Sequence, residues 1–177
     1  MISEQDVMKL RPATPDDAAA IAALHVALWR GTYRDLMPDA LLDGLSIEQR
    51  TRFWRDEIER LGDQIVVATD GAALRGFVSF GRTINPWPGY DHEIYTLYVD
   101  TQAQGRGVGR ALLRTACGQL QRDGAHNLVI WALAGAPANQ FYARHGGKLL
   151  VTRPFRYGDH DLEETGYGWD TIRMLIG

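Results

Sequence analysis

The sequence predicts a mixed α/β or α+β fold in a single domain over residues 1–177. Predicted strands and helices alternate along the chain, and a glycine-rich segment past mid-chain separates a strand from an amphipathic helix. The length of 177 residues suits one domain of the usual size of about 100–200 residues. Hydrophobic residues make up 45% of the chain and charged residues 23%, which is ordinary for a globular protein.

The first third of the chain predicts one short strand followed by helices. Residues 7–11 have the pattern of a strand, and Thr14 has the features of an N-cap that starts a helix to about residue 29. We expect a short helix over 39–45. A longer helix, capped by Ser46, is expected to run to about Leu61.

The next part predicts three strands. Residues 64–69 are rich in β-branched side chains, and the turn dipeptide Asp70-Gly71 joins them to a partner strand at 74–80. Residues 82–91 contain prolines and a glycine and are expected to form a loop. A third strand is expected over 93–99.

The second half repeats strand and helix signals. An amphipathic helix is expected from residue 108 until Asp123-Gly124, and then an apolar strand over 127–133. A short helix follows over 138–145. Residues 148–157 and 161–174 are expected to form two strands joined by a turn.

Composition excludes several classes of function. The net charge of -3 argues against broad electrostatic binding to nucleic acid. Cys117 is the single cysteine, so neither an intramolecular disulfide nor a multi-cysteine zinc site can form, and we expect no metal. The longest apolar stretch, at 128–138, is shorter than the roughly 20 residues of a membrane-spanning helix. No secretory signal is visible, so we expect a cytoplasmic protein whose residues 1–6 could be disordered.

The glycine-rich segment at 104–110 carries most of the functional information. A helix N-terminus offers free amides and a positive dipole end, and glycines let a phosphate approach the backbone closely. A Walker loop starting at Gly105 would need its second glycine where Arg110 stands, and a dinucleotide fingerprint from the same start fails at that position too. The remaining pattern is Gln104-x-x-Gly107-x-Gly109.

This pattern resembles the phosphate loop of the GCN5-related N-acetyltransferases. The resemblance extends from about Lys9 to the C-terminus, with its core at 93–147. It implies a central mixed, mostly antiparallel sheet flanked by helices, and a loop whose amides hold the diphosphate of acetyl-coenzyme A. A glycine-rich turn that merely starts a helix is the alternative. The cofactor-binding residues implied are Gln104, Gly105, Arg106, Gly107, Val108, Gly109 and Arg110.

A second block at 139–146 also resembles the family. Asn139 and Tyr142 are three residues apart and share one face of the predicted helix. The resemblance places this face along the pantetheine arm, with Asn139 bonded to the arm and Tyr142 near the sulfur, where its hydroxyl acts as the acid. An ordinary half-buried tyrosine is the alternative, and Phe141 is expected in the core.

Acetyl transfer to an amine also needs a base, because a free alkylammonium has a pKa of about 10.4 and no lone pair. We expect this base to be Glu93, at the start of the strand before the loop, as in some family members. His92 competes with it, and an exposed or salt-bridged Glu93 is the alternative. Strand alternation predicts one shared face for Glu93, Tyr95, Leu97 and Val99. Leu97, Tyr98 and Val99 are expected to contact the cofactor.

The acceptor side is less defined. Trp29 and Tyr33 lie four residues apart on a helix that borders the acceptor cleft in family members, and the alternative for Trp29, as for Trp54, is a core position. Other aromatic residues that could frame an amine are Trp54, Trp87, Tyr90, Tyr157 and Trp169. Acids that could bind a cationic acceptor, or could simply be solvated, are Asp35, Asp91 and Asp159.

The resemblance therefore implies an N-acetyltransferase in which a primary amine of a small molecule or peptide attacks acetyl-coenzyme A directly. No covalent enzyme intermediate is needed, so we expect Cys117 in the core. The expected partner is this amine, without nucleic acid or membrane, and the chain is expected to be a monomer or homodimer. A non-catalytic acyl-coenzyme A sensor of the same fold is the alternative function.

Overall fold

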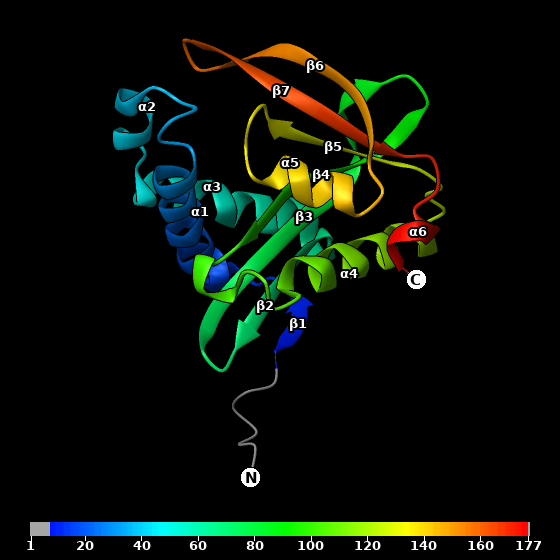
Figure 1. Ribbon diagram of the computed structural model, residues 1–177. Helices are drawn as coiled ribbons and strands as arrows, with labels where there is room; N and C mark the ends of the chain where they lie inside the picture. Colours follow the sequence, from blue (N-terminus) through cyan, green and yellow to red (C-terminus); the bar gives the residue numbers. More distant parts are fainter. Residues whose placement is uncertain (1–7, 177) are drawn as a thin grey trace.

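The computed structural model describes residues 8–176, which form one seven-stranded sheet with helices on both faces (Figure 1). The strand order is β1-β2-β3-β4-β5-β7-β6. The pair β4–β5 is parallel and the other neighbouring pairs are antiparallel, which confirms the expected mixed sheet. The expectation for residues 1–6 lies outside the described residues.

The elements follow the predicted order. The strands are β1 (Lys9–Pro12), β2 (Ile65–Asp70), β3 (Ala73–Trp87), β4 (Tyr90–Val99), β5 (Leu128–Leu133), β6 (Lys148–Tyr157) and β7 (His160–Trp169). The helices are α1 (Ala18–Thr32), α2 (Asp39–Asp43), α3 (Ile47–Leu61), α4 (Val108–Arg122), α5 (Ala138–Arg144) and α6 (Arg173–Ile176). Short 3-10 turns lie at Pro15–Asp17, Gly62–Gln64 and Thr101–Ala103.

Local capping explains where two of the helices start. Ser46 caps α3 as predicted, because its hydroxyl accepts a hydrogen bond of 3.2 Å from the amide of Gln49. At the first helix the chain instead makes a 3-10 turn over Pro15–Asp17, and the carboxylate of Asp17 accepts from the amide of Thr14 at 2.8 Å. The α-helical part of this segment therefore begins at Ala18.

The described residues form three apolar clusters, and the two largest lie on opposite faces of the sheet. On one face, Ile21 of α1 and Trp54 of α3 pack with Phe77 of β3. On the other face, Leu112 of α4 and Tyr142 of α5 belong to the larger cluster, which also includes residues of α6. The sheet thus separates helices α1 and α3 from helices α4, α5 and α6 (Figure 1).

The prediction of a loop over residues 82–91 is wrong. Strand β3 continues to Trp87 and β4 begins at Tyr90, so only a short turn separates them. Tertiary hydrogen bonds hold this extension, since the carboxylate of Glu93 accepts from the amides of Ile84 and Asn85 at 3.0 Å each. The final strand is likewise shorter than expected, because β7 ends at Trp169 and residues 173–176 form α6.

Strand β4 contains a bulge that alters which side chains share a face. Ser79 of β3 pairs with Thr96, but the next residue pairs with Ile94, so Tyr95 is an extra residue in β4. Leu97 and Val99 pack with the α4 core, while Tyr98 packs with the α1–α3 core. The predicted common face of Glu93, Tyr95, Leu97 and Val99 is therefore wrong, because the bulge shifts the alternation between Glu93 and Leu97.

Strands β4 and β5 pair only briefly. Their register pairs in the described residues are Glu93 with Val129 and Ile94 with Ile130. Beyond these pairs and the bulged Tyr95, residues 96–99 of β4 keep β3 as a partner on one side and have no strand partner among the described residues on the other. The chain thus leaves an unpaired strand edge next to the start of α4, with free backbone donors and acceptors.

Candidate active site

The segment before α4 presents a run of free backbone donors. In the described part of the chain, the amides of residues 105–110 donate to no backbone carbonyl and to no side chain, whereas Ala111 already bonds back to Gly107 at 2.9 Å. Helix α4 starts at Val108 and runs for 15 residues. Six consecutive N–H groups at the positive end of a long helix are therefore free to donate hydrogen bonds to a ligand.

Two glycines give this loop its shape. Gly105 and Gly107 have φ angles of 73° and 84°, in the left-handed region that other residues rarely adopt. A Cβ atom at either position would meet no heavy atom within 4 Å. The space over the loop is thus open, and a cradle of this shape with free amides fits a diphosphate group.

The side chains of the other predicted loop residues lie in three different environments. The side chain of Gln104 donates a 3.1 Å hydrogen bond to the carbonyl of Val99, so it ties the loop to the end of β4. Val108 is buried in the α4 core, which leaves only its backbone for a ligand. Arg106 and Arg110 are exposed, and neither forms an ion pair with a described residue.

The side-chain amide of Asn139 has a hydrogen-bonded Nδ2 and an Oδ1 without a partner among the described residues. Its Nδ2 donates to the carbonyls of Leu133 at 2.8 Å and Ala136 at 2.9 Å, which fixes the side chain against the end of β5. Its Oδ1 is buried and has no hydrogen-bond partner among the described residues. A buried acceptor without a donor is costly, so this oxygen suits an N–H group of a bound molecule.

Tyr142 lies in the α4 core at 5% exposure and packs at 5.9 Å from the ring of Tyr167. Burial, assisted by the nearby Tyr33, raises the pKa of the Tyr142 hydroxyl. Tyr98 is coupled to both of these tyrosines, and burial raises its pKa well above the usual value. Three protonated hydroxyls, from β4, α5 and the residue that follows α1, therefore gather at the edge of β4.

Glu93 is 2% exposed and accepts four hydrogen bonds. Its Oε2 accepts from the hydroxyl of Thr83 and from the amides of Ile84 and Asn85, while Oε1 accepts only from Asn85 Nδ2 at 2.9 Å. The interpretation of Glu93 as an exposed strand-end residue is therefore wrong. One lone pair of Oε1 is still free for a proton or a water molecule.

His92 lies apart from this carboxylate. The two residues are adjacent in β4, so their side chains leave the sheet on opposite faces. Burial and the nearby Arg82 lower the pKa of His92, and Asp123 and His126, just after α4, also lie near its ring. His92 thus lies on the α4 face of the sheet, away from the carboxylate of Glu93.

Aromatic side chains gather on the α1 side of β4. Trp29 and Tyr33 contact each other with ring centres 5.7 Å apart, and the Trp29 Nε1 donates a 2.8 Å hydrogen bond to the hydroxyl of Tyr98. Tyr157, at the end of β6, lies 5.2 Å from the Trp29 ring. We call His25, Trp29, Tyr33, Tyr98 and Tyr157 the aromatic cluster.

The sequence interpretation missed two polar members of this region. His25 stacks on Tyr98 at 5.1 Å, and Arg50 of α3 lies 5.8 Å from the Trp29 ring and donates to the hydroxyl of Tyr157. The repeat of His25, Trp29 and Tyr33 at intervals of four residues was the available signal, because such residues share one helix face. Arg50 had no comparable signal, because only the tertiary fold brings α3 against β6.

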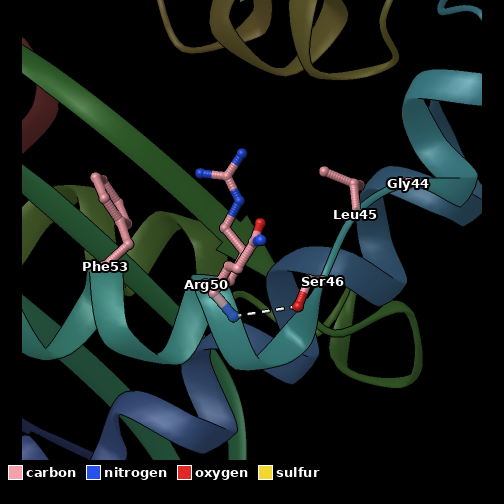
Figure 2. Close-up of a pocket in the computed structure, with 6 residues that line it drawn as sticks. Gly44, Leu45, Ser46, Arg50 and Phe53 are labelled. Carbon is pink, nitrogen blue, oxygen red and sulfur yellow. Dashed lines mark hydrogen bonds between the residues drawn. The ribbon is translucent and has the colours of Figure 1, made fainter.

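Arg50 also borders a cavity of about 270 Å³ between the end of α2 and the start of α3 (Figure 2). Figure 2 shows Arg50 extending away from α3 on the same side as Phe53, whose ring centre is 5.6 Å from the guanidinium carbon. The residues that line the cavity are Gly44, Leu45, Ser46, Gln49, Arg50 and Phe53.

The remaining aromatic candidates have structural positions. Trp54 and Trp169 are core residues, Trp87 packs on Trp131 at 5.9 Å, and Tyr90 donates to Asp170 at 2.6 Å. The acids suggested for a cationic acceptor are exposed and distant in sequence from one another: Asp35, Asp91 and Asp159.

Cys117 is fully buried, and burial raises the pKa of its thiol to about 12, which confirms the expected core position. Among residues 8–176 we find no group of three potential metal ligands. In the same range no helix is long and apolar enough to span a bilayer.

Comparison with known proteins supports the fold. The chain is 28% identical over 169 residues to an uncharacterized N-acetyltransferase, YuaI of Bacillus subtilis, covering 96% of both chains. An N-acetyltransferase structure from Staphylococcus aureus Mu50 superposes with a TM-score of 0.69 at 24% identity, covering 93% of this chain and 99% of that one. The YncA acetyltransferase of Salmonella typhimurium, solved with its cofactor acetyl-CoA, gives a TM-score of 0.67 at 23% identity and covers 93% and 94%.

The family comparison covers the site itself. Residues 24–147 match the acetyltransferase (GNAT) family, and this range contains the glycine loop, the splayed strands, Asn139 and Tyr142. Most of the chain lies within the match, so the chain belongs to the acetyltransferase (GNAT) family.

Proposed function

We propose that this protein transfers the acetyl group of acetyl-coenzyme A to a primary amine of a small molecule or peptide by direct attack in a ternary complex. The observation that carries the proposal is the run of six free amides at residues 105–110, at the start of α4 and beside the unpaired edge of β4. That the related YncA structure was solved with acetyl-CoA supports this choice of donor.

The residues around the unpaired edge fit the parts of this donor. The amides of 105–110 hold the diphosphate, with Arg106 and Arg110 free to add charged contacts. Asn139 offers its orphaned Oδ1 to an N–H group of the pantetheine arm. The backbone of Leu97, Tyr98 and Val99 lines the gap in which the arm lies and supplies further hydrogen bonds.

Acetyl-coenzyme A supplies the activated acetyl thioester, and the chain supplies donors for the charges that develop. Free amides of β4 beyond the Tyr95 bulge donate to the acetyl oxygen as it gains negative charge. The raised pKa of Tyr142 keeps its hydroxyl protonated at neutral pH. This hydroxyl therefore donates to the departing sulfur and acts as the acid.

The amine must lose a proton to attack, and we assign this proton to Glu93. Its Oε1 retains a free lone pair, while the other hydrogen bonds keep the carboxylate in place. Glu93 takes the proton directly or through a water molecule. Trp29 and Tyr33 border the acceptor, and both pack in one apolar cluster with Tyr98.

A thiol-release assay tests the proposal. The purified protein is mixed with acetyl-coenzyme A and a panel of primary amines, and free thiol is followed with a chromogenic disulfide reagent. We expect release that depends on both the protein and at least one amine. Tight cofactor binding without thiol release from any amine would instead favour a non-catalytic acyl-coenzyme A sensor.

A further inference from the structure

Arg50 differs from the other half-buried arginines of the described chain. Arg75 pairs with Asp70 and Asp100, and Arg153 pairs with Glu164. Arg30 donates to three backbone carbonyls around the end of α2. In the described structure Arg50 forms no ion pair, and its one hydrogen bond goes to the hydroxyl of Tyr157. Most of its five N–H donors therefore have no protein acceptor.

A second free donor lies in the same region. Trp54 Nε1 can only donate, so at 3.1 Å it requires His25 Nδ1 to be the acceptor, and His25 Nε2 carries the proton. Nε2 has no partner among the described residues, although His25 is only 4% exposed. Burial and the positive charge of Arg50 keep this ring neutral.

These donors lie next to the proposed site of transfer. Arg50 is 5.8 Å from the Trp29 ring, and Trp29 bonds the hydroxyl of Tyr98. Tyr98 in turn interacts electrostatically with Tyr33, Tyr142 and Arg50. The aromatic cluster thus has an uncompensated positive charge on the α3 side and the proposed acid, Tyr142, on the α5 side.

We propose that the acceptor is a small molecule that carries a carboxylate together with its primary amine, as an amino acid does, and that Arg50 binds this carboxylate. This inference rests on the proposed function and deepens it. A guanidinium pairs well with a carboxylate because two of its N–H groups can donate in parallel. The rings of Trp29 and Tyr33 border the rest of the acceptor and favour an apolar side chain.

Pairs of acceptors that differ only in the carboxylate test whether this charge is recognised. Thiol release is measured with L-phenylalanine, L-methionine and L-leucine, each against its amide, at pH 8. The amide has the more acidic amine, so chemistry alone favours it over the amino acid. We expect kcat/KM to be about 10- to 100-fold higher for each preferred amino acid than for its amide, because a hydrogen bond between charged groups is lost in the amide; this ratio corresponds to about 1.4–2.7 kcal/mol.

Variants of α3 test the residue. Arg50→Met removes the charge and retains the stem, and it should abolish most of this preference while leaving kcat/KM for the amides within about threefold. Arg50→Lys should retain part of the preference, because the charge remains. Arg52→Met is the control, since Arg52 is exposed and pairs with Glu48 on the same helix, and the preference of this variant should equal that of the wild type.

Several results would overturn the inference. If wild-type protein uses amino acids and amides equally, or only simple amines, Arg50 does not select a carboxylate while the proposed acetyl transfer stands. If Arg50→Met slows every acceptor by the same factor, Arg50 only supports the fold through Tyr157. If neither amino acids, amides nor simple amines release thiol, the proposed function fails and this inference fails with it.

Discussion

The hydroxyl of Tyr142 combines two properties that an acid at a buried site needs. Its pKa is raised by burial, so it is protonated at neutral pH, and it lies near the hydroxyls of Tyr33 and Tyr98. The packing of its ring against Phe141 and Tyr167 fixes its position. The same burial that stabilises the α4 core therefore keeps a proton available at the edge of β4.

Replacing Tyr142 with Phe removes this proton and retains the ring. We expect kcat to fall by about 10- to 10³-fold with little change in the Kd of coenzyme A, because general acid catalysis contributes on that scale. Tyr167→Phe is the control, since it removes a hydroxyl from the same core. Steady-state kinetics and calorimetric titration check both variants, and an unchanged kcat for Tyr142→Phe would remove it from the acid role.

Glu93→Gln tests the base. We expect the greatest loss of rate near neutral pH and a smaller loss at high pH, where amines lose their protons unaided. Thr83→Val removes one hydrogen bond from the same carboxylate but leaves the base, so it should lower stability by about 1 kcal/mol and retain the rate. Rate against pH separates the two roles, and a constant ratio of variant to wild type across pH would point to another base.

His25 makes stability depend on pH. Its pKa is lowered to about 3, mainly by burial, so between pH 3 and 6.5 the unfolded chain binds a proton that the folded chain does not. The free energy of unfolding should thus decrease as pH falls through this window, by about 1.4 kcal/mol per pH unit from this group. The free energy of unfolding, measured with urea at several pH values, should fall more steeply with decreasing pH for the wild type than for His25→Gln. The same pH dependence for both proteins would contradict a buried neutral His25 ring.

Motifs made the loop, Asn139, Tyr142 and Glu93 predictable from the sequence as candidates, because each lies at a fixed position in a local pattern. Arg50 could not be found in this way. Its proposed role rests on the lack of a counter-ion among the described residues and on its contact with Tyr157, which is more than a hundred residues away in the chain. His25 could have been suspected, since it repeats with Trp29 and Tyr33 on one helix face.

At the level of elements, the loop before α4 depends on two backbone conformations. Gly107 has a φ of 84° and open space where a side chain would project. A valine there is strained in this conformation and would project toward the space assigned to the diphosphate. Gly107→Val should therefore weaken coenzyme A binding by at least about 10-fold, which corresponds to about 1.4 kcal/mol, as measured by calorimetric titration.

Gly71→Val provides the matched control for this loop. Gly71 also has a positive φ, of 56°, and open space around its missing side chain, but it lies in the β2–β3 turn. Its variant should lose stability through similar backbone strain and bind coenzyme A normally. Equal affinity of Gly107→Val and wild type would count against the loop as the diphosphate site.

Elements with strong local signals were predictable, and elements held by distant contacts were not. Ser46 marked the start of α3, and the apolar periodicity marked α4. The β3–β4 extension was mistaken for a loop because its prolines and glycine dominate the local pattern. Its strand conformation depends instead on hydrogen bonds to Glu93 and on Asn127, which donates to Gly89 at 2.6 Å.

For the whole molecule, the central feature is a sheet in two parts that meet at one short parallel pair. Strands β1 to β4 form one part and β5, β7 and β6 form the other. The free amides and Asn139 lie on the α4 and α5 side of this junction, and the aromatic cluster lies toward α1, α3 and the end of β6. The proposed donor and acceptor can thus approach the edge of β4 from different directions.

A crystal structure of the protein with coenzyme A tests this account most directly. We expect diphosphate oxygens within about 3.2 Å of amides from residues 105–110, and the pantetheine arm between β4 and β5 with an N–H group donating to Asn139 Oδ1. Coenzyme A bound at another surface, with these amides free of ligand contacts, would contradict the account.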